Sequence, residues 1–458
     1  MQKLRRELLS TAPLAALVLL SSAAPPLAAR DPRIAEIVAA SSAERIETDI
    51  RTLVGFGTRH TLSETDSATR GIGAARRWIA AELERISARC GGCLEVITLA
   101  ETFSGERRVP DGTEVVNVLA LQRGSEPGRH VVMSGDIDSR VSDVMNGTAD
   151  SPGANDNASG IAGVLEAARL LSAHRFRATI VYAALSGEEQ VLLGGRTVAR
   201  HAREQGWQVE AVLNNDMIGN IEGVDGIVDN SSVRVFSDAT PPTETEEERR
   251  ARRSTGGEVD GISRQLARYV DRVADLYFPT LDVMMVYRLD RFGRGGHHTP
   301  FADVGFPAVR IMETHENYTR QHQDLRVEDG IAYGDTIDGV DFDYAAKVTA
   351  LNAATLASLA WAPAPPREVE IFGAVQPAAR LSWQPPAAGG AARYRVYWRL
   401  TDSPTWDHSA LLGDVTEHTF EGLVIDNYYF GVASVSPDGH ESAVVFPRPG
   451  SRRPPPRG

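Results

Sequence analysis

The sequence contains little cysteine, only Cys90 and Cys93 among its 458 residues. Their C-x-x-C spacing has no second copy along the chain, which disfavours a zinc site built from four cysteines. A redox-active pair and a local disulfide both fit this spacing. We expect a structural disulfide that pins the turn after an amphipathic helix, because the N-terminus favours export to an oxidising compartment.

The sequence also lacks an excess of basic residues. It has 48 Lys and Arg against 61 Asp and Glu, which gives a formal net charge of -13. Binding of nucleic acid requires clustered Lys and Arg that neutralise phosphates, so this balance argues against a nucleic-acid partner. The length suffices for roughly two or three domains of about 100–200 residues each.

Long apolar runs are absent after the N-terminus, so we expect no stable membrane span in the mature chain. The stretch from Lys3 to Arg6 is basic, residues 12–24 are a short apolar run, and small residues precede Ala29. We predict that residues 1–29 are a signal peptide cleaved near Ala29, and that the chain is secreted or periplasmic. An uncleaved anchor is the alternative.

Residues 30–361 alternate between helical and strand patterns. Apolar residues recur at helical spacing over 34–54, 70–89, 158–172 and 344–359, and short apolar segments at 115–121, 130–134, 179–185, 209–214 and 304–312 indicate strands. This alternation predicts an α/β fold with a mostly parallel central sheet and helices on both faces. Residues 238–258, rich in charge, are expected to form a solvated loop.

The pattern changes after residues 362–366, a Pro-rich segment that predicts a stiff linker. Between residues 367 and 447, short alternating strands separated by turn residues predict an all-β sandwich. The strands at 381–383, 394–398 and 428–432 resemble, in this order, a fibronectin type III domain. Its role, binding a partner or spacing and stabilising the rest, stays open. The Pro- and Arg-rich end, 448–458, is predicted to be a disordered tail.

Carboxylate and imidazole groups gather in short clusters, most of them at predicted strand ends. The residues concerned are Asp136, Asp138, Asp156, Glu188, Glu189, Asp216 and His322. Each cluster alone fits a helix cap or a solvated turn. Together they would converge in one crevice, because ligands of open α/β sheets bind outside the carboxyl ends of the strands. Crowded acids repel one another unless divalent cations intervene, and carboxylates with imidazole suit zinc.

The segments 152–160 (PGANDNASG), 187–189 (GEE) and 215–217 (NDM) follow one another in an informative order. In this order they resemble metallopeptidase family 28, the co-catalytic zinc aminopeptidases, over residues 31–361. The resemblance implies that Asp156 bridges two zinc ions and that Glu188 is the general base. It implies further metal ligands at Glu189, Asp216 and His322, with His322 preferred to the nearby His315.

The first metal ligand departs from the family pattern. The family has His-x-Asp-Ser, whereas this chain has Asp136-Ile137-Asp138-Ser139. Asp136 can bind zinc through oxygen, and its negative charge could favour a harder ion such as manganese. The departure is also compatible with a site for a single ion. Asp138 takes the family's catalytic position that steadies the His, and its partner in this chain is left open.

The resemblance also assigns residues to the substrate. His298, in the stretch 294–301, aligns with a family His that precedes a Phe, and is either a substrate contact or a satisfied structural imidazole. His297 replaces an acid, and Tyr318 is assigned to substrate binding.

The implied activity is that of a secreted zinc exopeptidase. It would remove N-terminal residues from peptides or proteins through metal-activated water, with Glu188 as the base. Two alternatives stay open. One is a single-zinc transferase like the glutaminyl cyclases, and the other is an inactive binding protein on a peptidase fold.

Overall fold

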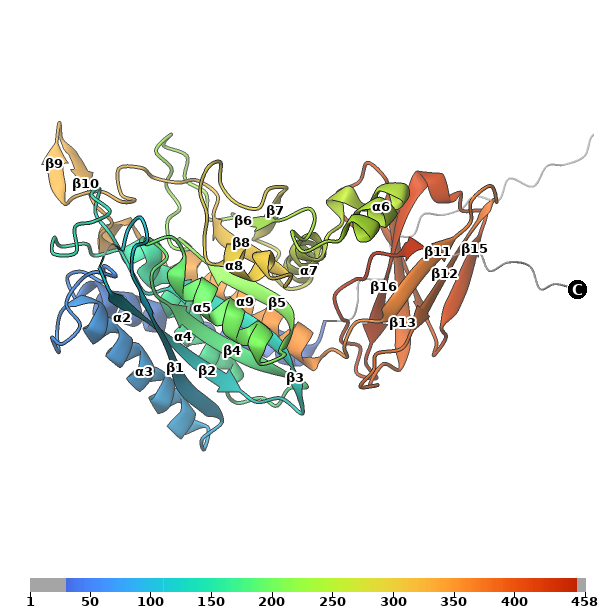
Figure 1. The fold of residues 1–458 in the computed structure, drawn as a ribbon, viewed down its shortest axis with the longest axis horizontal. Coiled ribbons are helices and arrows are strands. Elements are labelled where there is room, and N and C mark those ends of the chain that lie inside the picture. Colours follow the sequence, from blue (N-terminus) through green and yellow to red (C-terminus); the bar gives the residue numbers. More distant parts are fainter. Residues whose placement is uncertain (1–29, 110, 451–458) are drawn as a thin grey trace, which may run out of the picture.

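A computed structural model describes residues 30–109 and 111–450 of the chain. The predicted signal peptide and the end of the predicted tail lie outside the described residues. Figure 1 shows an α/β unit followed by smaller β-sheets toward the C-terminus. None of the helices in the described ranges combines the length and the apolar character that a bilayer crossing requires.

The central sheet of the α/β unit has, within the described residues, the strand order β1-β2-β4-β3-β5-β8-β6-β7. The strands are β1 Leu94–Phe103, β2 Thr113–Gln122, β3 Glu126–Asp136, β4 Ala178–Leu185, β5 Gln208–Asn215, β6 Ser232–Ser237, β7 Asp282–Val286 and β8 Ala308–Glu313. The central strands are parallel, in the order β4, β3, β5 and β8. Three pairs are antiparallel, namely β1 with β2, β2 with β4, and β6 with β8. The predicted α/β class with a mostly parallel sheet is confirmed.

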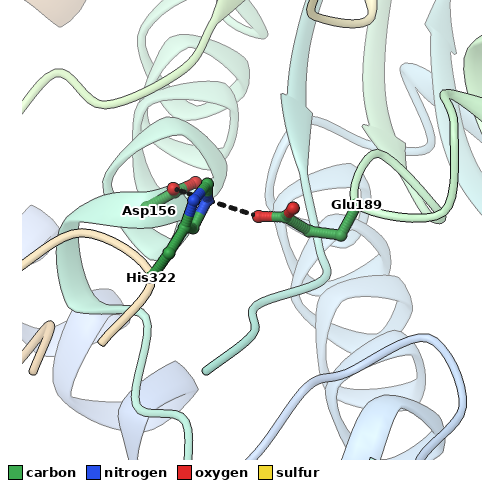
Figure 2. A group of neighbouring side chains, drawn as sticks. All are labelled: Asp156, Glu189 and His322. Carbon is green, nitrogen blue, oxygen red and sulfur yellow. Dashed lines mark ion pairs between the residues drawn. The ribbon is translucent and has the colours of Figure 1, made fainter. Parts of the chain in front are cut away.

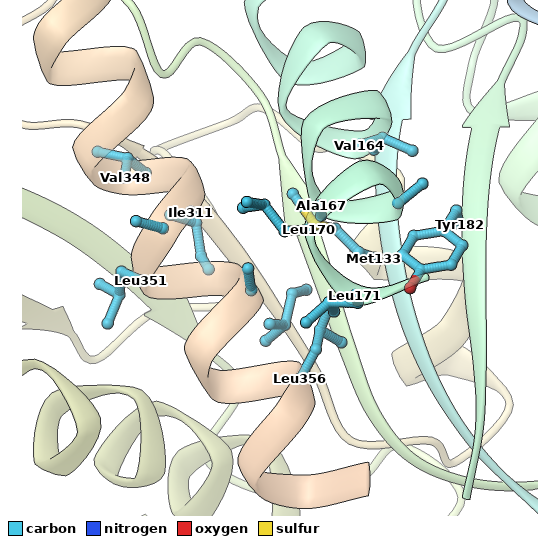
Figure 3. Packing of buried hydrophobic residues seen from close by; sticks show 14 of the residues in the cluster. Met133, Val164, Ala167, Leu170, Leu171, Tyr182, Ile311, Val348, Leu351 and Leu356 are labelled. Atoms are coloured by element: carbon cyan, nitrogen blue, oxygen red, sulfur yellow. The ribbon is translucent and has the colours of Figure 1, made fainter. Parts of the chain in front are cut away.

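Helices cover both faces of this sheet. One face packs against α1 Pro32–Ala40, α2 Ala43–Val54, α3 Gly71–Arg89, α4 Gly160–Leu171, α7 Ile262–Tyr277 and α9 Phe342–Trp361, and the other against α5 Leu193–Glu204 and α8 His298–Asp303. Figure 3 shows the larger core, where Val348 and Leu351 of α9 lie near Ile311 of β8. Along β3, Met133 faces this core and Val132 faces the opposite one, so the strand is a continuous apolar run.

Two expectations about helices are corrected. Residues 34–54 are not one helix, because the chain breaks between α1 and α2, where the Ser42 side chain caps α2 by accepting from Arg45 N. Residues 238–258 are not all loop, since Glu246–Thr255 forms α6. No residue of α6 is buried, so apolar periodicity could not reveal it. The capping box between Thr245 and Glu248 is the signal that marks its start.

Cys90 and Cys93 are joined by a disulfide at the C-terminal end of α3. Glycines at 91 and 92 between them both have positive φ, which residues with a Cβ rarely adopt.

Residues 367–449 form two sheets with a shared core, in the described part of the chain. One has the order β15-β12-β11-β17 and the other β14-β13-β16. The strands are β11 Arg367–Phe372, β12 Ala378–Gln384, β13 Arg393–Leu400, β14 His408–Leu412, β15 Glu417–Glu421, β16 Tyr428–Val435 and β17 Arg448–Pro449. Leu381 and Trp383 of the first sheet meet Val396 and Phe430 of the second, which makes the unit a β-sandwich.

The sandwich is attached to the α/β unit by a buried ionic contact. Asp260, just before α7, accepts two hydrogen bonds from Arg399 of β13 at 2.9 and 2.7 Å and one from Arg268 of α7 at 2.7 Å. All three side chains are almost fully buried. Nearby, the Tyr269 hydroxyl donates to the Glu441 carbonyl at 2.9 Å. Both units therefore depend on one carboxylate for the neutralisation of two buried guanidinium groups.

Asp260→Ala should destabilise the protein, because it leaves two buried guanidinium groups without their carboxylate. We expect a loss of roughly 3–5 kcal/mol in the free energy of unfolding, the usual cost of removing one member of a buried ion pair. Urea unfolding followed by tryptophan fluorescence measures it. The matched control is Asp402→Ala at an exposed position, expected within about 0.5 kcal/mol of the wild type. Equal midpoints for the two variants would contradict the prediction.

Candidate metal and catalytic site

The acidic clusters lie at one edge of the central sheet, because their strands are neighbours and parallel. β3 ends at Asp136, β4 leads into the turn with Glu188 and Glu189, and β5 ends directly before Asp216. Gly187 precedes the pair of glutamates with a φ of +73°, which suits glycine. Parallel order thus gathers residues that lie far apart in the sequence.

Asp156, Glu189 and His322 form the group that can hold a metal ion among the described residues. One ligand atom from each lies within 4.8 Å of the other two. His322 Nε2 lies 2.9 Å from Asp156 Oδ2 and 2.8 Å from Glu189 Oε1, and Figure 2 shows its ring facing both carboxylates. Two carboxylate oxygens and an imidazole nitrogen are ligands that zinc accepts, with one position left for water or substrate.

The electrostatics of this group also suit a cation. Burial opposes protonation of His322, but Glu189 and Asp156 outweigh it and raise its pKa to about 9. Burial likewise raises the pKa of Asp156 and Glu189, yet the adjacent His322 holds both below their ordinary values. The ring proton lies between the carboxylates where a metal would bind, so metal binding must release a proton.

Arg140 completes the surroundings of the group. Its Nε donates to Glu189 Oε2 at 2.6 Å, and its Nη2 lies 2.7 Å from His322 Nδ1. Both a protonated imidazole and an imidazole that binds metal through Nε2 carry a proton on Nδ1, so neither form can accept a hydrogen bond from Arg140 at that atom. The bond to Glu189 involves the oxygen that does not face His322, and it can persist.

Asp138 holds the turn that carries the two glutamates. Its carboxylate accepts from Glu188 N at 3.1 Å, from Glu189 N at 3.0 Å and from the Thr61 hydroxyl at 3.1 Å. The partner that the sequence left open is therefore the Glu188–Glu189 backbone. Burial, followed by Glu189, raises the pKa of Asp138.

Glu188 lies beside the metal-binding group without belonging to it. Its side chain is only partly exposed. Burial raises its pKa well above the ordinary value, and the neighbouring carboxylates Glu189, Asp216, Asp136 and Asp156 raise it further. A carboxyl that is reluctant to lose its proton is suited to carry one between reacting groups near neutral pH.

Asp136 and Asp216 are the predicted ligands that the metal-binding group does not include. Asp136 Oδ1 lies 2.5 Å from His297 Nδ1, and Oδ2 accepts from Asn157 Nδ2 at 2.8 Å. Asp216 Oδ2 lies 2.6 Å from Arg310 Nη2. Both carboxylates are thus paired with nitrogen groups of the protein.

The two residues assigned to substrate lie in different settings. His298 is fully buried, and its Nε2 lies 2.7 Å from the Leu289 carbonyl. Its Nδ1 has no hydrogen-bond partner among the described residues, so the ring is not fully satisfied and its contact with substrate stays a prediction. Tyr318 is 54% exposed, on the loop that leads to His322. Its role in substrate binding stays a prediction.

Sequence reasoning missed Arg140, Arg310 and Asp335. Asp335 accepts from Asn155 N and from Asp156 N, the latter at 2.6 Å, and so fixes the distorted turn that presents Asp156. It lies 179 residues from Asp156, with no local motif to reveal it. Arg310 had a usable signal, because it is a charged residue inside the apolar strand β8.

Comparisons with known proteins identify the family of the chain. The model of peptidase family M28 matches residues 117–334. A probable zinc metalloprotease of Pyrenophora tritici-repentis is 43% identical over 424 residues, which are 92% of this chain and 88% of the relative. Another, of Leptosphaeria maculans, is 44% identical over 92% of this chain and 98% of the relative.

A similar fold occurs among solved structures. The crystal structure of the Legionella pneumophila LapA aminopeptidase matches with a TM-score of 0.51. The match covers 72% of this chain and 75% of LapA at 17% sequence identity, so it shows a shared fold alone.

Asp335→Asn should weaken zinc binding, because the Asn side chain keeps only one of the two oxygens that accept hydrogen bonds from the Asn155 and Asp156 N–H groups. Changes to groups that orient a metal ligand typically cost about 10–100-fold in affinity, and we expect a loss in this range. Competition with a chromophoric chelator measures the dissociation constant. The matched control is Asp338→Asn, an exposed aspartate three residues away whose affinity should equal that of the wild type. Unchanged affinity in Asp335→Asn would refute this role.

Proposed function

Because the chain belongs to peptidase family M28, we propose that it is a zinc metalloprotease that removes residues from the N-termini of peptides. The observation that carries this proposal is the convergence of Asp156, Glu189 and His322 with Glu188 beside them. The printed name of the fungal relatives, probable zinc metalloprotease, agrees with it.

Zinc fits the residues present. Asp156 and Glu189 would supply oxygen ligands and His322 a nitrogen ligand, and their two negative charges balance the charge of one divalent ion. When bound, the ion supplies Lewis acidity that acidifies water and polarises a scissile carbonyl.

Glu188 acts as the general base and acid in this proposal. Its carboxylate takes the proton of the attacking water and returns it to the leaving amine. Asp138 positions it, because the hydrogen bonds to the Glu188 and Glu189 amides fix the turn between β4 and α5. Burial of Asp138 and of the turn away from water strengthens these hydrogen bonds.

The exopeptidase part of the proposal rests on less direct support. The motifs resemble those of co-catalytic zinc aminopeptidases, and the printed name of LapA is that of an aminopeptidase. The gathered carboxylates of Asp156, Glu188 and Glu189 are also suited to attract the positively charged N-terminus of a peptide.

We further propose that the protein is exported and that its parts follow the boundaries expected from the sequence. These are a signal peptide at 1–29, a peptidase domain at 30–361, a linker at 362–366, a fibronectin type III-like domain at 367–447 and a tail at 448–458. The N-terminal sequence pattern supports export, and the disulfide between Cys90 and Cys93 suits an oxidising compartment.

Glu188→Gln should abolish most of the peptidase activity while zinc stays bound, because the amide cannot accept the proton and Glu188 is outside the metal-binding group. We expect kcat to fall by about 10²–10⁴-fold. Steady-state hydrolysis of aminoacyl p-nitroanilides, together with the zinc content, measures both effects. The matched control is Glu204→Gln on the exposed end of α5, which should retain wild-type kcat. A variant at position 188 with wild-type kcat would remove Glu188 from the mechanism.

The same assay separates the exopeptidase from other activities through its substrates. Peptides with a free N-terminus should be cleaved, and their N-acetylated counterparts should not. Cleavage of both would indicate an endopeptidase, and conversion of an N-terminal glutaminyl peptide to its cyclised form without hydrolysis would indicate a cyclase.

The mature chain exported by a bacterial host should lack the predicted signal peptide. Intact-mass spectrometry of the protein recovered outside the cytoplasm should give the mass of a chain that begins near Arg30. A mass that includes residues 1–29 would show that this segment is retained, as an uncleaved anchor requires.

A further inference from the structure

The region for a second metal ion lies next to the group Asp156, Glu189 and His322. By resemblance its ligands would be Asp136 and Asp216, with Asp156 shared between the two ions. The described residues offer a metal-ligand group only at the first of these places. The contacts of Asp136 and Asp216 give the reason.

Arg310 occupies the space next to Asp216. It belongs to β8, the parallel neighbour of β5, and its side chain is fully buried. Nη2 lies 2.6 Å from Asp216 Oδ2, while Nη1 donates to both Asp290 oxygens at 2.9 and 3.0 Å and to the Gly295 carbonyl at 3.0 Å. A guanidinium is permanently charged, so a buried cation already lies against the carboxylate that a second ion would need.

Asp136 is also fully paired. His297 Nδ1 contacts one of its oxygens, and the Asn157 amide donates to the other. Asn157 Nδ2 is held in place by a second bond, to the Asn215 carbonyl at 2.7 Å. Binding of a metal to Asp136 would therefore compete with buried contacts, and loss of the contact to His297 would leave the Nδ1 atom of that ring without its partner.

We infer that the Arg310 guanidinium takes the place of the second cation, so that the protein holds one zinc ion, at Asp156, Glu189 and His322. This inference rests on the proposed function for the identity of that ion. Arg310 is a positioning residue in this arrangement, since it fixes Asp216 and neutralises it without a ligand role. Glu188 also lies within the electrostatic reach of Arg310, so the fixed charge acts on the proposed base as well.

The number of zinc ions per chain tests the inference on the purified full chain. The protein is saturated with zinc, freed of excess metal, and measured by native mass spectrometry and by elemental analysis. One ion per wild-type chain is expected. Two ions per chain would overturn the inference and leave the proposed function standing, whereas no bound zinc would overturn both.

Variants at position 310 test whether the guanidinium is the cause. Arg310→Gln removes the charge and should admit a second ion, whereas the matched Arg310→Lys keeps a cation and should still bind one. A single ion in a folded Arg310→Gln variant would show that something else excludes the second ion, and would overturn the role given to Arg310.

Asp216→Asn provides a variant that does not depend on removing a buried cation. Because Asp216 is not a ligand in the one-ion arrangement, this variant should bind as many ions as the wild type, whereas His322→Ala should lose the ion. X-ray absorption at the zinc edge adds a readout on the wild type. Metal–metal scattering at about 3.5–4 Å would contradict the inference, and its absence together with one ion per chain is expected.

Discussion

The crowding of buried negative charge at the carboxyl ends of β3, β4 and β5 is the constraint on which the rest of the site depends. Asp136, Asp138, Glu189 and Asp216 are nearly inaccessible to solvent, and the partly exposed Asp156 and Glu188 lie among them. A carboxylate buried without a partner is costly enough to change its protonation state, so each one needs a positive or hydrogen-bonding neighbour. The fold supplies these neighbours one by one, and the kind of neighbour decides what each acid can do.

Three kinds of neighbour divide the acids into three roles. Backbone N–H groups satisfy Asp138, which makes it a support for the turn between β4 and α5. Nitrogen side chains satisfy Asp136 and Asp216, which ties them to His297 and Arg310. Asp156 and Glu189 face His322, whose bound proton can be exchanged for a metal ion. Metal binding is therefore expected at Asp156, Glu189 and His322, where the positive charge that balances the carboxylates is a proton that can dissociate.

Much of this arrangement was readable from the sequence. Apolar periodicity predicts the central strands, and because parallel strands end at one edge of a sheet, it also predicts that the acids lie close together. The positively charged partner of Asp216 could not be predicted in the same way. Arg310 and Asp216 are 94 positions apart on neighbouring strands, and their contact exists only once the order of β5 and β8 is known. Helix α6 could not be predicted from apolar periodicity either, because none of its residues is buried.

The substitution of Asp for His at position 136 gains a physical meaning from these contacts. In the sequence, this aspartate adds negative charge to the predicted metal site, which would weaken the Lewis acidity of the metal ion. In the structure, the imidazole of His297 contacts the Asp136 carboxylate. The Arg310 guanidinium, which is permanently charged, lies against Asp216. The additional acid and the buried arginine are thus two parts of one charge balance. A histidine at 136 together with an arginine at 310 would place more positive charge beside the group of Asp156, Glu189 and His322. With an aspartate at 136 that charge is balanced, and a divalent ion bound to the group would have the two carboxylates of Asp156 and Glu189 as its own counter-charges.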